Sequence, residues 1–586
     1  MTANPQQDGA SLLAIDVGEI HTRAALFDVV EGRYRFLAFG SAPTTVAAPY
    51  HHVGEGIRKA LGQLEEITGR TLVGMDERLV MPERQDGSGV DTFVATMSAG
   101  PPLKVLGVGL LDDVSLEGVK RLTTTISARL VEALSLNDRR KPEGRLDTIL
   151  GTRPDVIIIA GGTEEGASYS VLRLVDAVGL ACSLIPKERR PDVLYAGNGK
   201  LVDEVKTKLK AVTNLYIAPN LLPDLDTEQI APARTRLADI FRSVRGRQIQ
   251  GVKELDAWAG KRLTPTSTAF GRVIQFLSKV YDPTKGVLGV DVGASATTIA
   301  AAFAGDLALG VYPQFGLGRG LPELLKSVSA SQIARWLPVE VSEDYLTDYI
   351  YNKSIHPGSI PVTPEDLAIE LALTRQVIRS SLALAAADFP KSVHSSAESQ
   401  WPMFEPILAA GSTLTQAPSP GHSLLTLLDA LQPVGVTTLV LDQSNLTAPL
   451  GAAARLNPVL VVQVLESSAF LSLATVISPA AHVRLGTPIL RLRVTYESGD
   501  ETSFEIKQGS LEALPLPMGE SARLRLQPLH RADVGMGGPG RGGSVRVVGG
   551  VLGVVIDARG RPLQLPDDAG RRRDLYKKWL WTLGGG

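Results

Sequence analysis

The chain has 586 residues, of which 44% are hydrophobic and 21% are charged, and its net charge at pH 7 is −2. This length allows about three domains, and the composition is ordinary for a globular protein. The near-zero charge argues against wholesale binding of nucleic acid or of a membrane surface. The single cysteine, Cys182, excludes an intramolecular disulfide and a multi-cysteine metal site. We expect a cytoplasmic protein, because no apolar run approaches membrane-spanning length and residues 1–10, predicted to be flexible, lack the features of a signal peptide.

The first predicted element is a β-hairpin in the segment LLAIDVGEIHTRAALFD, residues 12–28. An apolar strand ends near Asp16, Gly18 follows in a polar turn, and Thr22 opens the returning strand. Backbone amides in such a turn can face a phosphate group, and a carboxylate at its edge can hold a hydrated Mg²⁺. An ordinary buried hairpin has the same short pattern, so both interpretations stay open for this segment alone.

The stretch between this hairpin and residue 283 alternates strand and helix patterns, which predicts an α/β sheet. The unbroken apolar run at 154–160 predicts a buried strand, and residues 115–136 are predicted to form a helix. The glycine turn at 161–166 is either an anion site or a place where strand and helix pack closely. It lacks a Walker lysine and the Rossmann spacing, and Glu164 would repel phosphate.

The hairpin pattern returns in GVLGVDVGASATTIAAAF, residues 286–303, where Asp291, Gly293 and Thr297 take the places of Asp16, Gly18 and Thr22. Two copies, each at the start of a long α/β stretch, favour phosphate and metal binding over an accidental turn. We therefore predict that Asp16 and Asp291 are metal ligands that lie near enough to share one hydrated Mg²⁺.

From about residue 466 the pattern changes to short alternating runs, which predict antiparallel strands. The glycine-rich segment at 531–550 has no following helix to complete a phosphate site, so we interpret its glycines as turns and bulges. The tail RRRDLYKKWLW, residues 571–581, combines basic and aromatic side chains. We predict a short helix that docks on the body or on a partner, and nucleic acid or anionic lipid is the alternative ligand.

Several segments, taken in their order along the chain, resemble the MutL (GlmL) family linked to glutamate mutase, which is unrelated to the mismatch-repair protein of the same name. The resemblance covers about residues 11–455. It rests on the two hairpins and on SAPTTV (41–46), PDVIIIAGGTEEG (154–166), VLYAGN (193–198), TPTSTAF (264–270) and ILAAGSTL (407–414). Within TPTSTAF, Thr264 or Thr266 is predicted to cap a helix.

This family is part of the actin-like ATPase superfamily, and the resemblance implies an α/β fold with two ribonuclease-H-like lobes that clamp ATP and Mg²⁺. Lobe I would be residues 11–283 and lobe II residues 284–465, followed by a mainly-β domain at 466–570 and the tail at 571–586. The nucleotide-binding residues that follow from the hairpins and from the resemblance are Asp16, Gly18, Thr22, Asp291, Gly293, Thr297, Gly411 and Ser412.

The resemblance also implies a function, an ATP-dependent partner or reactivator of an adenosylcobalamin-dependent mutase with weak ATPase activity. The partner would be the mutase or another protein that contacts the C-terminal domain, and nucleic acid is not an expected partner. Four positions depart from the family pattern: Glu19 at the first turn, Ala294 and Thr298 where the family has Gly and Asp, and Ser412 in place of a second glycine. These departures favour the alternative of an actin-like scaffold that keeps the fold and has lost the chemistry.

Overall fold

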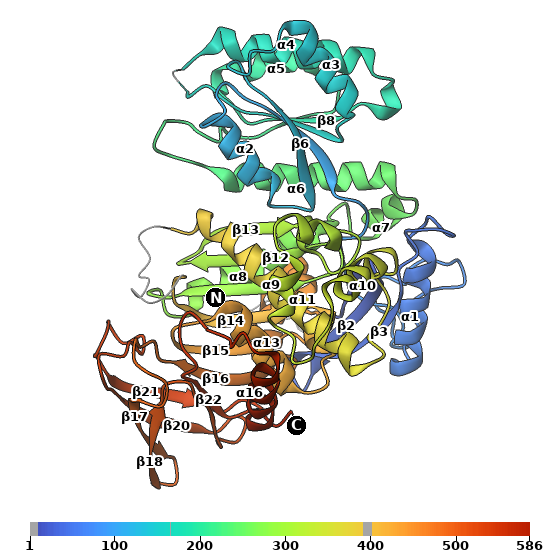
Figure 1. Ribbon diagram of the computed structural model, residues 1–586. Helices are drawn as coiled ribbons and strands as arrows, with labels where there is room; N and C mark the ends of the chain where they lie inside the picture. The colour runs from blue at the N-terminus through green and yellow to red at the C-terminus, as the bar shows by residue number, and fades with distance from the viewer. Residues whose placement is uncertain (1–9, 165, 391–400, 586) are drawn as a thin grey trace, which may run out of the picture. The chain divides into compact units, whose positions relative to one another are not determined.

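The computed structural model describes residues 10–164, 166–390 and 401–585 (Figure 1). The chain divides into two compact units, Met1–Leu26 with Ala38–Ala269, and Phe27–Leu37 with Phe270–Gly586. Nearly all of the N-terminal segment predicted to be flexible lies outside the described residues. Among the described residues, no helix is long and apolar enough to cross a membrane.

The first sheet has five strands in the order β10-β4-β1-β2-β3. β1 pairs with β4 in parallel, and so does β10, whereas the short turns between β1, β2 and β3 make those neighbours antiparallel. The strands are β1 (Leu12–Val17), β2 (His21–Val30), β3 (Arg33–Pro43), β4 (Thr92–Met97) and β10 (Thr264–Pro265), and the accompanying helices are α1 (Gly54–Thr68) and α7 (Val252–Trp258). α8 (Thr266–Val280) follows β10, and from Phe270 onward it belongs to the second unit.

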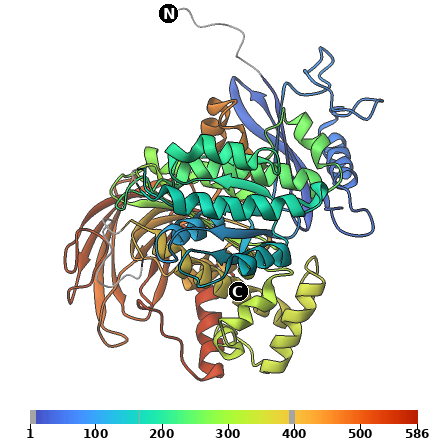
Figure 2. The ribbon, with the colours of Figure 1, turned by 90° about the horizontal axis from the view of Figure 1, so that it is seen from above.

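A second five-stranded sheet of the first unit has the order β6-β5-β7-β8-β9, with every neighbouring pair parallel. Helices α3, α4 and α5 cover one face and α2 and α6 cover the other, and Figure 2 shows the first three running alongside one another. The strands are β5 (Leu103–Val108), β6 (Ala128–Leu134), β7 (Val156–Ile159), β8 (Asp192–Tyr195) and β9 (Leu215–Ile217), and the helices are α2 (Ser115–Thr123), α3 (Pro142–Thr152), α4 (Ser168–Leu184), α5 (Val202–Leu209) and α6 (Ile230–Gln248).

The predicted helix at 115–136 is wrong in its second half, which forms β6. Thr123 and Thr125 donate their hydroxyls to the carbonyls of Val119 and Leu122 at 2.7 Å and 2.8 Å, so they close the helix at this point. Residues 123–126 are four consecutive β-branched side chains, a run that disfavours continuation of the helix. Cys182, in contrast, is buried in α4 as expected, and burial raises the pKa of its thiol to about 11.

The second unit contains an eight-stranded sheet in the order β13-β12-β11-β14-β15-β16-β22-β19. Its first five strands repeat the arrangement of the first sheet, because β13, β12 and β11 are antiparallel and β11, β14 and β15 are parallel. These strands are β11 (Gly286–Val292), β12 (Thr297–Phe303), β13 (Asp306–Tyr312), β14 (Phe404–Ala410) and β15 (Gly435–Leu441). The α/β fold class is confirmed, and its two lobes begin with the two predicted hairpins.

The helices of the second unit enclose one large apolar core with the central strands. The longest, α11, begins at Pro364, where Thr363 and Asp366 form a reciprocal capping box. The helices are α9 (Ala330–Ala334), α10 (Glu343–Ile355), α11 (Pro364–Ala385), α12 (Ser412–Thr415), α13 (Pro420–Leu431), α14 (Thr447–Ala453), α15 (Pro458–Leu465) and α16 (Ala569–Thr582).

The strands predicted beyond residue 466 are present, but they are divided between two sheets. β16 (Leu471–Ser478), β19 (Leu511–Leu514) and β22 (Val554–Asp557) extend the eight-stranded sheet. β17 (Pro488–Tyr496), β18 (Glu501–Lys507), β20 (Ser521–Pro528) and β21 (Gly543–Val548) form a four-stranded antiparallel sheet of their own. We predicted that residues 466–570 fold as a separate domain, and this stays a prediction. The backbone pairing of β16 with β15 does not favour it.

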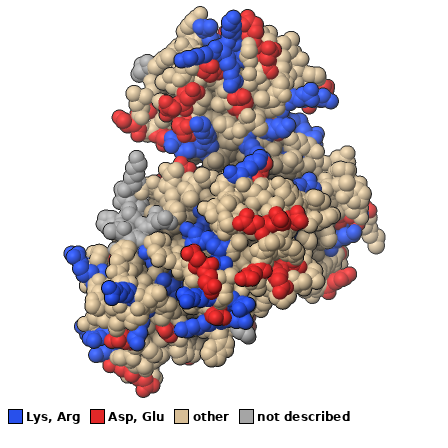
Figure 3. All heavy atoms as spheres, viewed as in Figure 1, with Lys and Arg blue, Asp and Glu red and all other residues tan. Residues whose placement is uncertain are grey.

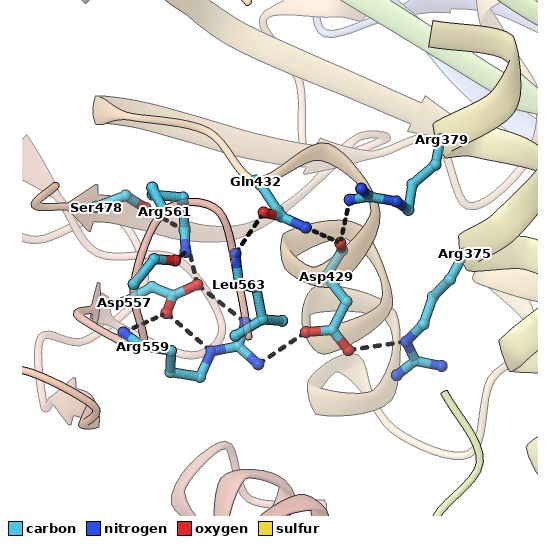
Figure 4. Close-up of polar contacts among 10 residues, drawn as sticks. Arg375, Arg379, Asp429, Gln432, Ser478, Asp557, Arg559, Arg561 and Leu563 are labelled. Carbon is cyan, nitrogen blue, oxygen red and sulfur yellow. Dashed lines mark hydrogen bonds and ion pairs between the residues drawn. The ribbon is translucent and has the colours of Figure 1, made fainter. Parts of the chain in front are cut away.

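The tail forms the helix α16, as predicted, and it packs against α13 (Figure 1). Trp579 and Leu580 are buried, but Trp581 is 79% exposed, so only part of the apolar tail is covered. Beneath the helix lies a buried network of three arginines and two aspartates, in which Arg375, Arg559 and Arg561 bind Asp429 and Asp557 (Figure 4). The aromatic rings of Tyr576 and Trp579 lie over two of these guanidinium groups.

Candidate functional site

Asp16 lies next to last in β1 and is only 7% exposed. Two hydroxyl groups from distant parts of the chain donate to its Oδ1, that of Thr96 at 2.6 Å and that of Thr266 at 2.9 Å. Thr266 therefore starts α8 with its hydroxyl bound to this carboxylate and not as a helix cap. No described residue donates to Oδ2 of Asp16, so the carboxylate is held in one orientation with its second oxygen available.

The turn after Asp16 is closed by its own backbone. The amide of Gly18 donates to the carbonyl of His21 at 3.0 Å, and a Cβ at Gly18 would lie 2.8 Å from that same oxygen. Thr44 donates its hydroxyl to the carbonyl of Gly18 at 2.8 Å and lies 3.0 Å from the hydroxyl of Thr22. The SAPTTV segment thus supports the first turn, and the fully buried Thr22 is part of that support.

Glu19, which departs from the family pattern, accepts a hydrogen bond from the amide of Gly100 at 3.1 Å. The loop that contains Gly100 is also bound by Arg245, which is fully buried and donates to the carbonyl of Pro101. Burial lowers the pKa of Arg245 to about 10, although the nearby charges of Asp155 and Glu19 oppose this shift. The carboxylate of Glu19 therefore has a structural partner and a buried cation near it, which reduces its expected repulsion of phosphate.

The second turn repeats this geometry at the end of β11. The amide of Gly293 donates to the carbonyl of Ala296 at 3.0 Å, and the buried hydroxyl of Thr297 donates to the carbonyl of Phe315 at 2.7 Å. The amides of Ala294 and Ser295, at the tip of the turn, donate to no described group. They are the donors that could face a phosphate, whereas the amides of Gly18 and Gly293 are already used within their turns.

Gly411 lies beside the second turn because β14 and β11 are parallel neighbours, with Ala410 opposite Asp291. Its φ is +114°, and a Cβ here would lie 2.2 Å from the carbonyl oxygen of Val292. Glycine is therefore required for close contact between the two strand ends. Ser412 begins α12 and is exposed.

The structure thus brings the predicted residues together in two groups. Asp16, Gly18 and Thr22 belong to the first unit, and the others, Asp291, Gly293, Thr297, Gly411 and Ser412, belong to the second. That Asp16 and Asp291 serve one metal ion stays a prediction. Among the described residues, no three His, Cys, Asp or Glu side chains gather as a metal site.

In the glycine turn after β7, the protein's own side chains and backbone occupy hydrogen-bonding groups. The amide of Gly199 donates to the carboxylate of Glu164 at 3.1 Å, and the side-chain amide of Asn220 donates to the same group at 3.0 Å. A Cβ at Gly161 would lie 3.0 Å from the side chain of Leu110. Close packing accounts for these glycines, and Glu164 already accepts from the backbone amide of Gly199.

The sequence pattern did not identify Thr96 and did not show that the hydroxyl of Thr266 binds Asp16.

We expect Thr266→Val to weaken MgATP binding a few-fold and to cost about 1 kcal/mol of stability, because Asp16 loses one of its two orienting donors. Isothermal titration and chemical denaturation measure the two effects. Ser267→Ala is the matched control, since the neighbouring hydroxyl makes only a 3.5 Å contact with the carbonyl of Thr125. Equal MgATP affinity in wild type and Thr266→Val would contradict the orienting role.

Comparison with known proteins places these features in a family. The family model described as MutL protein matches residues 12–469, which include both turns, Gly411 and Ser412. The chain belongs to the MutL family. Protein MutL of Clostridium tetanomorphum is 24% identical over 273 residues, which are 45% of this chain and 57% of that protein. The chain therefore spans a little over half the length of this curated relative.

Solved structures show more distant likeness. The nucleotide-free acetone carboxylase is 12% identical, with 86% of this chain and 81% of that chain covered and a TM-score of 0.31. Component A of (R)-2-hydroxyglutaryl-CoA dehydratase from Acidaminococcus fermentans is 8% identical, with 76% and 97% covered and a TM-score of 0.25. The nucleotide-free diol dehydratase-reactivating factor is 10% identical, with 77% and 100% covered and a TM-score of 0.31. The repeated strand order of the two lobes agrees with the two-lobed α/β fold that the sequence predicts.

Proposed function

We propose that the chain binds MgATP and acts as an ATP-dependent partner or reactivator of an adenosylcobalamin-dependent mutase. The observation that carries the nucleotide part is the repeated Asp-x-Gly turn, which stands at the end of the equivalent strand in two sheets of the same order. The mutase part rests on the family resemblance. Bound MgATP would supply phosphoryl transfer to water, the reaction that this class of protein couples to conformational change.

The residues of this chain have separable roles in the proposal. Oδ2 of Asp16, oriented by Thr96 and Thr266, would contact the hydrated metal ion. The amides of Ala294 and Ser295 would donate to phosphate oxygens, and Asp291 at the preceding strand end would contribute the second carboxylate. Gly411 lets the ends of β14 and β11 stay in close contact, which would hold Asp291 and the second turn in place for the nucleotide.

A second candidate is a scaffold without turnover, which the departures at Ala294, Thr298 and Ser412 favour. The fourth departure from the family pattern, Glu19, is a weaker argument for loss of ATP hydrolysis. Its carboxylate accepts a hydrogen bond from the amide of Gly100, so the protein itself already binds it. Nucleotide binding is common to both candidates, and turnover separates them.

The partner role is tested by incubating an inactivated adenosylcobalamin-dependent glutamate mutase with the full chain, free cofactor and MgATP. We expect mutase activity to return with MgATP and not with a non-hydrolysable ATP analogue. Binding of ATP without turnover, together with no return of activity, would establish the scaffold instead. The Asp16→Asn variant is the negative control for any recovery that does not depend on the nucleotide.

The register of the second hairpin suggests how turnover could be raised. Thr298 is buried opposite Asp291, so Thr298→Asp places two carboxylates on directly opposed positions. We expect this variant to be less stable without Mg²⁺, by about 1 kcal/mol or more, and to hydrolyse ATP faster when Mg²⁺ is present. Thermal melts with and without Mg²⁺ and a phosphate-release assay measure both effects. Thr298→Asn, without the added charge, is the control, and equal turnover in both variants and wild type would show that the missing group lies elsewhere.

A further inference from the structure

The four-stranded sheet formed by β17, β18, β20 and β21 has two unlike faces. One face is apolar and closes a separate core, to which Leu492, Val494, Leu524 and Val547 contribute. The opposite face carries the alternate residues of the same strands and is exposed. We call this second surface the arginine face, defined by Arg491, Arg493, Arg523, Arg525 and Arg546.

The arrangement of these arginines is unfavourable for folding. Arg493 lies directly opposite Arg525, and Arg523 lies directly opposite Arg546. Like charges at directly opposed positions of neighbouring strands destabilise a sheet. The acidic side chains that contact these arginines lie at the edges of the face. Glu501 and Glu505 of β18 are 3.9 Å and 3.6 Å from Arg493 and Arg491. Glu497, just after β17, is 3.7 Å from Arg546, which also donates to the hydroxyl of Ser521 at 2.9 Å. No described carboxylate pairs with Arg523 or Arg525, so partners inside the chain do not account for the arginines in the middle of the face.

Exposure and position point to an interaction with another molecule. The side chains of Arg491 and Arg493 are 61% and 56% exposed, and that of Arg546 is 76% exposed. Figure 3 shows Lys and Arg spread over this lower left part of the molecule, with acidic side chains at its tip. The whole chain has a net charge of only −2, so the positive charge here is local. The face also lies beyond residue 469, where the match to the family model ends.

We propose that the arginine face binds an acidic surface of a protein partner. Guanidinium groups form paired, planar hydrogen bonds with carboxylates, and a regular sheet presents them at fixed spacing. A single-stranded nucleic acid fits less well, because every outward position of these four strands is among the described residues and none carries an aromatic ring for base stacking. This inference does not depend on nucleotide binding.

The test uses the full chain and two fluorescent probes, poly-L-glutamate and a thymidine oligonucleotide of similar charge, measured by anisotropy. The face variant combines Arg491→Gln, Arg493→Gln, Arg523→Gln and Arg525→Gln. We expect it to bind poly-L-glutamate at least about tenfold more weakly than wild type, with an unchanged or raised melting temperature because opposed like charges are removed. Wild-type binding should fall steeply between about 50 mM and 300 mM salt.

The matched control removes the same number of exposed charges from α16, with Arg571→Gln, Arg573→Gln, Lys577→Gln and Lys578→Gln. It should keep most of the affinity for poly-L-glutamate, and lysine at the four face positions should restore part of the binding that the face variant loses. Equal loss in the control and the face variant would overturn the proposal. Tighter binding of the oligonucleotide, or self-association of the chain that the face variant abolishes, would overturn it in favour of nucleic acid or of a second copy.

Discussion

Asp557→Asn should destabilise the second unit by about 3–5 kcal/mol, the cost of breaking a buried ion network from one side. Asp557 is fully buried at the end of β22, where Arg559 donates to both of its oxygens at 2.8 Å and 3.0 Å. Arg561 adds a third bond at 2.8 Å. Asparagine would leave Arg561 buried without its counter-charge and would leave Arg559 with Asp429 alone. Urea denaturation followed by circular dichroism measures the loss of stability.

The network also joins the C-terminal segment to lobe II, as Figure 4 shows. Arg559 also forms an ion pair with Asp429 of α13 at 2.7 Å. Asp429 accepts a further bond from Arg375 of α11 at 2.8 Å. Glu501→Gln, which removes an exposed contact in the same unit, is the control and should cost less than about 1 kcal/mol. Similar losses in the two variants would mean that the network does not hold the segment in place.

The same network predicts a pH dependence. Burial alone would raise the pKa of Asp557, but Arg559 and Arg561 together hold it well below its usual range. A folded pKa below the unfolded value of about 4 gives stability that is present above pH 4 and is lost as the pH falls toward the folded value. We expect the unfolding free energy of wild type to fall steeply below about pH 4, and that of Asp557→Asn to fall less.

Gly411→Ala should cost about 3 kcal/mol or more and should also impair nucleotide binding. At φ +114° and ψ 143° this residue has a backbone conformation that only glycine adopts readily, and a Cβ would lie 2.2 Å from the carbonyl oxygen of Val292. Relief would require β14 to move away from β11, which would displace the neighbouring Asp291. Denaturation and MgATP titration measure the two effects.

Gly62→Ala is the control for a general effect of adding a methyl group. Gly62 lies within α1, where a Cβ would meet no atom within 4 Å, so alanine should stabilise this helix by about 0.5–1 kcal/mol. A Gly411→Ala protein that is as stable as wild type would show that the strand ends are less closely packed than the structure has them.

Elements whose signals are local could be predicted from the sequence. Both hairpins and the buried strand β7 follow from apolar runs and turn residues. The pairing of β16 with β15 could not be predicted, because an alternating pattern indicates a strand without naming its neighbour. The same limit explains why one predicted β segment is shared between two sheets.

The residues of the candidate site also differ in whether a local sequence pattern reveals them. Asp16 and Asp291 are visible in the sequence because the pattern around them is duplicated. Thr96 and Thr266, which orient Asp16, are 80 and 250 residues away from it in the chain, and no local pattern connects them. The Asp429–Arg559 pair spans 130 residues and was missed for that reason.

The central claim is that both Asp-x-Gly turns serve the binding of MgATP, and titration of ATP in the presence and absence of Mg²⁺ tests it most directly. Wild type should bind ATP in a Mg²⁺-dependent manner. Asp16→Asn and Asp291→Asn should each weaken binding by about tenfold or more, because each removes a charged ligand of the metal ion. Failure of wild type to bind, or affinities in both variants equal to that of wild type, would contradict the claim.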